Sequence, residues 1–174
     1  ALNQLWQLGL GHERLAIISA SIGSDVPFFL NGGLAIVGGR GELVEYKETL
    51  VNGNFVFLIP ELDITNKTAW IYSHITPDLF TNGNQSKNFF SSVSSDSTVD
   101  TSLLGNVFQS ITPNLIPSIR KYQEDLLVAG GPNALLSGTG PSVYSFIPQY
   151  EEALKVKTKL EELGHSPILA QAIK

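Results

Sequence analysis

Asp25 is an acidic residue in an unusually apolar and stiff stretch of this sequence. It stands in the stretch SIGSDVPFF, residues 21–29, between a glycine and a proline and just before two phenylalanines. A carboxylate held within hydrogen-bond reach of a hydroxyl can accept its proton or orient it. Gly23 permits a sharp change of direction, Pro27 fixes its own φ, and the two phenylalanines can anchor the turn to a core. On pattern alone, an aspartate that forms a turn or ends a helix is the commoner case.

A second candidate is the stretch LSGTGPSVYSF, residues 136–146. Gly138 and Gly140 flank Thr139 between two apolar runs, and glycines there let the backbone approach an anion and turn its N–H groups toward it. A tight hairpin turn is the simpler interpretation. The run is not a lysine-containing phosphate loop, because no lysine follows it.

Two further features, the GGRGE run and Tyr72, indicate a function only in combination with the other segments. The run GGRGE, residues 38–42, is typical of a hairpin turn in which Arg40 pairs with a nearby carboxylate. Tyr72 follows Thr68 by one turn of a predicted helix, where a core or rim position is commoner than a ring that stacks on a base. None of these segments identifies a reaction by itself.

The elements that must position these residues are readable from periodicity and glycines. Helices are expected over residues 1–8 and 13–20, the second ended by Gly23 in a left-handed conformation. Residues 32–39 and 41–47 predict a hairpin. The remaining expectations are strands at 54–62, on both sides of the 138–140 turn and near the C-terminus, helices at 65–72, 103–108, 116–128 and 150–163, and a surface loop at 81–102 with Phe89 and Phe90 as anchors. This order favours an α+β fold in which helices cover one face of an antiparallel sheet.

Composition excludes several classes of function. The 174 residues carry a net charge of −5, so phosphate-contacting binding to nucleic acid is not expected. No cysteine is present, the three histidines are far apart, and no apolar run is long enough to cross a membrane. We therefore expect no metal ligands among these residues. The protein is expected in the cytoplasm, or in a plastid if its source is eukaryotic.

The joint order of these segments resembles the GHMP kinase superfamily. The run IGSDVPFFLNGGLAIVGGRGE, residues 22–42, is similar to the family pattern LGADVPFFLxGGxAxxxGxGE and is followed by a T-A-W-x-Y helix start and the Gly-Thr-Gly run. Within the superfamily, the similarity is to kinases of the non-mevalonate isoprenoid pathway that act on a cytidine-containing alcohol. It extends over the whole chain and is weakest between about 80 and 128.

The resemblance implies roles for individual residues. Asp25 falls on the catalytic aspartate of the family, and the run Gly138, Thr139, Gly140 falls on a motif that lines the active site beside the phosphates. Tyr72 falls where members place an aromatic ring against cytosine, with Thr68 on the same helix, although Trp70 can serve instead. ATP and Mg²⁺ are the implied cofactors, and a small molecule is the implied partner.

The resemblance also implies a division of the chain. Residues 1–50 would be the end of an N-terminal kinase domain that bears Asp25, and residues 51–174 a ferredoxin-like C-terminal domain. Because the sequence begins in mid-helix without a methionine, we expect the natural N-terminus to be absent. The resemblance implies that the ATP-cradling loop and most of the magnesium ligands lie upstream of Ala1, so no activity is expected from these residues alone. Another GHMP enzyme, such as a homoserine or mevalonate kinase or a related decarboxylase, and a non-catalytic binding module remain alternatives.

Overall fold

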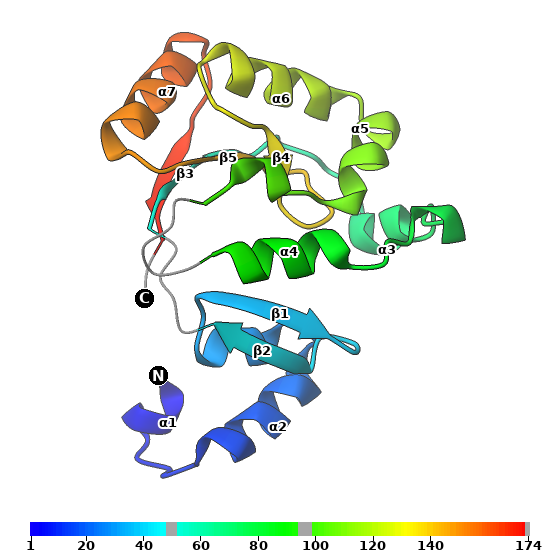
Figure 1. Cartoon of the computed structure of the whole chain (residues 1–174), viewed down its shortest axis with the longest axis vertical. Helices are drawn as coiled ribbons and strands as arrows, with labels where there is room; N and C mark the ends of the chain where they lie inside the picture. The colour runs from blue at the N-terminus through cyan, green and yellow to red at the C-terminus, as the bar shows by residue number, and fades with distance from the viewer. Residues whose placement is uncertain (48–51, 94–98, 173–174) are drawn as a thin grey trace. The chain divides into compact units, whose positions relative to one another are not determined.

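The chain forms two compact units, residues 1–50 and 51–173, each with its own β-sheet (Figure 1). The computed structural model describes residues 1–47, 52–93 and 99–172. No helix in this described part is long and apolar enough to cross a membrane.

The first unit is a helical segment followed by a hairpin. Its elements are α1 (Leu2–Leu5), α2 (His12–Ile22), the 3-10 helix η1 (Val26–Leu30), β1 (Leu34–Gly38) and β2 (Leu43–Lys47). The expected hairpin is confirmed, with Ile36 of β1 opposite Glu45 of β2. Helix α2 ends before Gly23 as expected, but the left-handed conformation is wrong, because Gly23 is extended with φ −178° and ψ 156°.

The second unit is built on a four-stranded antiparallel sheet in the order β4-β5-β3-β6. The strands are β3 (Asn54–Leu58), β4 (Leu135–Leu136), β5 (Val143–Ile147) and β6 (Ile168–Gln171). Along β3 the side chains alternate, since Val56 and Leu58 are buried while Phe55 and Phe57 on the other face are half-buried. This alternation gives the sheet one face for the core and one aromatic face.

Helices α6 and α7 cover the core face of this sheet (Figure 1). The helical segments of the unit are α3 (Lys67–Tyr72), η2 (Pro77–Leu79), α4 (Asn84–Ser92), η3 (Thr101–Leu103), η4 (Val107–Ser110), α5 (Thr112–Leu115), α6 (Ser118–Val128) and α7 (Tyr150–Glu162). The fully buried Ile119, Leu126 and Leu160 of α6 and α7 join Val56 and Leu58 in one core. Each such side chain contributes roughly 1.5–3 kcal/mol by leaving water.

Two expectations about irregular regions are wrong. The segment expected to be a surface loop, 81–102, contains helix α4, in which Phe89 and Phe90 are half-buried; residues 94–98 lie outside the described part. The helix expected at 103–108 is replaced by the short 3-10 segments η3 and η4. Asp100 and Asn106 accept hydrogen bonds from the first-turn amides of Ser102 and Phe108, which favours tight turns over a continuous helix.

Candidate functional site

Asp25 lies on an exposed turn of the first unit, directly before η1. It occupies the capping position of η1, with φ −89° and ψ −11°, but its carboxylate caps no amide. Among the described residues the carboxylate has no hydrogen bond and no ion pair. Asp25 is therefore a turn residue at a helix terminus, as pattern alone favoured, but its carboxylate makes no hydrogen bond that would explain an aspartate at this position.

The turn that carries Asp25 is fixed by Tyr46 of β2, which the sequence reasoning missed. The Tyr46 hydroxyl lies 2.8 Å from the carbonyl oxygen of Pro27 and 3.1 Å from that of Phe28. The rings of Tyr46 and Phe28 are stacked, with centroids 6.4 Å apart, and Pro27 is buried. The expectation that both phenylalanines anchor the turn is half wrong, because the Phe29 side chain is 74% exposed.

The GGRGE run, residues 38–42, packs against the turn that carries Asp25. Gly41 has φ +119°, and a Cβ atom there would lie 2.3 Å from the carbonyl oxygen of Ser24, so the contact requires glycine. Arg40 does not form the expected side-chain ion pair within the described part; its backbone amide donates to the Glu42 carboxylate at 2.6 Å. Hydrogen bonds from the amides of Glu42 and Arg40 lower the pKa of the Glu42 carboxyl. Ala20, Ser24, Arg40 and Glu42 line a hollow of about 240 Å³ beside this contact.

The Gly-Thr-Gly run forms the turn between β4 and β5 in the second unit. We call residues 137–140 the glycine turn. Its glycines take positive φ, +55° at Gly138 and +75° at Gly140, and the Gly140 amide donates to the Ser137 carbonyl at 2.9 Å. The amides of Gly138 and Thr139 have no acceptor among the described residues. The run is thus the tight hairpin turn that was the simpler interpretation, and two of its adjacent N–H groups remain available to an acceptor.

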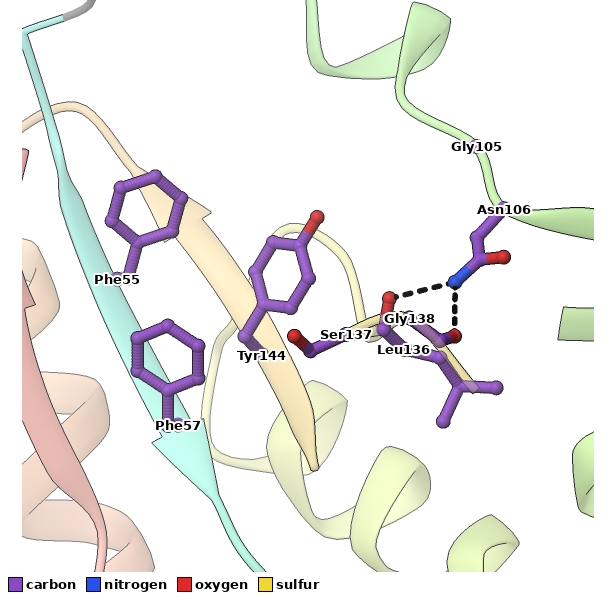
Figure 2. A pocket seen from close by; sticks show the side chains of 8 residues that line it. All are labelled: Phe55, Phe57, Gly105, Asn106, Leu136, Ser137, Gly138 and Tyr144. Atoms are coloured by element: carbon purple, nitrogen blue, oxygen red, sulfur yellow. Dashed lines mark hydrogen bonds between the residues drawn. The ribbon is translucent and has the colours of Figure 1, made fainter. Parts of the chain in front are cut away.

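Side chains from three other segments hold the glycine turn. The Asn106 amide nitrogen donates to the Leu136 carbonyl at 3.0 Å and to the Gly138 carbonyl at 2.7 Å (Figure 2). The Thr112 hydroxyl donates to the Thr139 carbonyl at 3.3 Å. From α3, the Lys67 ammonium donates to the Thr139 hydroxyl at 2.9 Å and to the carbonyl oxygens of Thr139 and Gly140. Sequence reasoning named neither Lys67 nor Asn106 as a site residue.

Helix α3 therefore lies next to the glycine turn, which brings the predicted residues of both segments into one neighbourhood. Thr68 is exposed beside Lys67, and Tyr72 ends the helix with 55% of its surface exposed. The Tyr72 ring meets Phe108 edge-on at 5.1 Å, which leaves part of the ring open. Trp70 is 37% exposed and meets the ring of His74 edge-on at 5.6 Å.

A pocket of about 380 Å³ lies on the aromatic face of the sheet, beside the glycine turn (Figure 2). It is lined by Phe55, Phe57, Gly105, Asn106, Leu136, Ser137, Gly138 and Tyr144. The rings of Phe57 and Tyr144 have their centroids 5.7 Å apart, and burial raises the pKa of the Tyr144 hydroxyl. The described residues contain no cluster of three or more histidine or acidic side chains that can hold a metal ion.

Comparisons with known proteins show which kinases the chain resembles. No family model matches the chain. A 4-diphosphocytidyl-2-C-methyl-D-erythritol kinase from Dehalococcoides mccartyi is 36% identical over 99% of the chain, and one from Listeria innocua is 34% identical over 89%. The chain is thus similar to kinases of this name over nearly its whole length. It spans 61% and 53% of these two proteins, respectively.

Solved structures of GHMP kinases share the fold. A 4-(cytidine 5'-diphospho)-2C-methyl-D-erythritol kinase superposes on 98% of the chain with a TM-score of 0.77 at 19% identity, and 60% of that kinase is covered. Homoserine kinase from Cytophaga hutchinsonii superposes on 99% with a TM-score of 0.67 at 18% identity, with 61% of its own length covered. The expected GHMP-like α+β fold is confirmed.

Proposed function

We propose that the full-length protein transfers the γ-phosphoryl group of ATP to the 2-hydroxyl of 4-diphosphocytidyl-2-C-methyl-D-erythritol. The observation that carries this proposal is the Asp25 carboxylate, which is exposed on a fixed turn and has no structural partner among the described residues. Curated relatives that match nearly the whole chain bear the name of this kinase. We also propose that residues 1–50 belong to the domain bearing the aspartate and residues 51–174 to the C-terminal kinase domain.

In the proposed reaction Asp25 orients the substrate hydroxyl and receives its proton. The hydroxyl oxygen forms a bond to the γ-phosphorus of ATP, the bond from that phosphorus to the bridging oxygen breaks, and ADP leaves. Phosphoryl transfer depends mainly on positioning and charge stabilisation, so a rigid carboxylate suits it better than a mobile one. The hydrogen bond from Tyr46 and the close contact of Gly41 with Ser24 supply that rigidity.

The glycine turn is proposed to lie on the phosphate side of the reaction. Its two unpaired amides, at Gly138 and Thr139, fit an anionic oxygen, and glycine at 138 and 140 permits the positive φ values of the turn. ATP supplies the phosphoryl group when bound. The described residues offer no carboxylate cluster for Mg²⁺, so no step is assigned to a metal ligand of this chain.

Tyr72 is proposed to hold the cytosine ring, with Thr68 on the same helix as a further substrate contact. The Tyr72 ring is more exposed than that of Trp70, and its edge-on contact with Phe108 steadies it without covering both faces. Stacking of a base on an aromatic ring is worth about 1–3 kcal/mol in single-stranded nucleic-acid sites. This supports Tyr72 over Trp70 as the stacking residue.

A panel of alcohols tests the proposal. The full-length protein is given ATP and Mg²⁺ with the diphosphocytidyl substrate, with homoserine or with mevalonate, and ADP release is measured. We expect turnover with the cytidine substrate alone. Turnover with homoserine would show a different GHMP kinase, which the shared fold permits, and no turnover with any alcohol would favour a non-catalytic protein.

A further inference from the structure

Lys67 is the one residue of α3 whose side chain is tied to the glycine turn. Its ammonium has three N–H donors, and three oxygens of Thr139 and Gly140 receive them: the Thr139 hydroxyl at 2.9 Å, the Thr139 carbonyl at 3.4 Å and the Gly140 carbonyl. These partners are separated from Lys67 by more than seventy positions in sequence. One side chain therefore links the helix that carries Tyr72 to the turn that carries the free amides.

The charge of Lys67 is not neutralised within the described part of the chain. No carboxylate there forms an ion pair with it, although Lys121, Lys155, Lys157 and Lys159 all have one. Partial burial lowers the pKa of the Lys67 ammonium. Neutral oxygens satisfy its donors but leave a net positive charge, and a charge removed from water is costly unless an opposite charge accompanies it. An anion bound at the glycine turn would provide the compensating negative charge.

The Thr139 hydroxyl is directed by this contact. Because its oxygen accepts a hydrogen bond from Lys67, its hydrogen must point away from the ammonium. No acceptor for that hydrogen is present among the described residues. The hydroxyl is thus a donor beside the two open amides of Gly138 and Thr139, and the adjacent ammonium strengthens it.

We propose that Lys67 is a positioning residue for phosphoryl transfer, which holds the glycine turn in one conformation and aims the Thr139 hydroxyl at a phosphate oxygen of the bound substrates. This inference rests on the proposed function. It assigns to Lys67 an effect that passes through Thr139, with no direct contact between its ammonium and the substrate, since the turn already occupies the three donors.

A double-mutant cycle on the full-length protein tests the proposal. Lys67→Met removes the charge, Thr139→Val removes the hydroxyl, and Lys87→Met, on the exposed side of α4, is the matched control. We expect Lys67→Met to lower kcat about tenfold or more and to change KM less than about threefold. We expect Lys67→Met to slow the Thr139→Val protein by a smaller factor than it slows the wild type, because the two changes share the contact between Lys67 and the Thr139 hydroxyl. Lys67→Arg, which retains the charge, should recover part of the lost kcat.

A second measurement does not depend on catalysis. Hydrogen exchange of peptides covering residues 137–140 is compared in the wild type, Lys67→Met and the milder Lys67→Gln, which keeps two donors. We expect exchange of the Gly140 amide to accelerate about tenfold in Lys67→Met and less in Lys67→Gln, with Lys87→Met unchanged. Unchanged exchange, or effects on kcat that add in the double variant, would overturn the proposal. If the full-length protein has no kinase activity but the Gly140 amide still exchanges faster in Lys67→Met, the proposed function is wrong, while the conclusion that Lys67 holds the glycine turn stands.

Discussion

The hydroxyl of Tyr46 lies 2.8 Å from the carbonyl oxygen of Pro27, two residues after Asp25, and joins the hairpin to the turn that carries the proposed base. Removing that hydroxyl in Tyr46→Phe should cost about 0.5–1.5 kcal/mol of unfolding free energy, the usual net value of one hydrogen bond. It should also lower kcat, because the turn is then less well fixed. Urea unfolding and steady-state kinetics check both effects.

Tyr150→Phe is the matched control for this change. Tyr150 is half-exposed at the start of α7, and its hydroxyl has no hydrogen bond among the described residues. Tyr150→Phe should therefore leave both stability and kcat at the wild-type level. Equal effects of the two substitutions would show that Tyr46 does not act through the Pro27 carbonyl.

Gly41→Ala is expected to damage the Asp25 turn from the other side. The new methyl group would lie 2.3 Å from the Ser24 carbonyl oxygen, at a φ of +119° that alanine rarely adopts. We expect a loss of about 2 kcal/mol or more, from strain and overpacking together. Gly83→Ala shares a positive φ, +73°, but meets nothing within 4 Å, and should cost only about 1 kcal/mol. If chemical denaturation shows equal losses of stability in Gly41→Ala and Gly83→Ala, the close contact with Ser24 is not the cause.

Much of the fold followed from pattern because its elements are locally consistent. The apolar run from Phe55 to Leu58 predicts β3, and the amphipathic stretch before Gly164 predicts α7, whose bounds were expected to within one residue. Helix α4 was missed because its serines and asparagines have the composition of a loop, while its two phenylalanines supply the packing that selects a helix.

The candidate site was only partly readable from sequence. Asp25 and the glycine turn stand in recognisable runs, but the residues that hold them do not. Lys67 is one of several lysines in the sequence and stands at the start of a short helix. Its partners belong to a turn more than seventy positions away. Tyr46 lies in an ordinary strand pattern. Contacts of this kind are set by tertiary packing, so a single sequence gives no local signal for them.

Tyr72→Ala should weaken binding of the cytidine substrate and leave binding of ATP unaffected. Loss of a stacking ring worth about 1–3 kcal/mol corresponds to roughly a 5- to 150-fold rise in the dissociation constant of that substrate. Trp70→Ala, two residues earlier, should change it much less. Calorimetric titration of each ligand into the full-length variants separates the cases, and an equal loss for both ligands in Tyr72→Ala would indicate a folding defect.

Stability in acid should depend on Asp125. Hydrogen bonds from Lys121, and then from His165 at 2.8 Å, outweigh the effect of burial and lower the pKa of the Asp125 carboxyl below its ordinary value of 3.8. A depressed pKa contributes stability that is fully present above the ordinary value and is lost as the pH falls through the folded-state value.

Asp125→Asn should therefore be less stable than the wild type at pH 5 and above. The difference should shrink as the pH falls below about 4, because the wild-type carboxyl is then protonated as well. Urea unfolding at a series of pH values measures it. A difference that stays constant down to pH 2 would contradict the assignment to ionised Asp125.

The turnover of Asp25→Asn in the full-length protein, with ATP and the diphosphocytidyl substrate, tests the central claim most directly. Asparagine keeps the size of the side chain but cannot receive the proton, so kcat should fall by about 10²–10⁴-fold. Binding of the cytidine substrate should stay within about twofold, and the exposed Asp78→Asn should have wild-type kinetics. Wild-type kcat in Asp25→Asn would contradict the account.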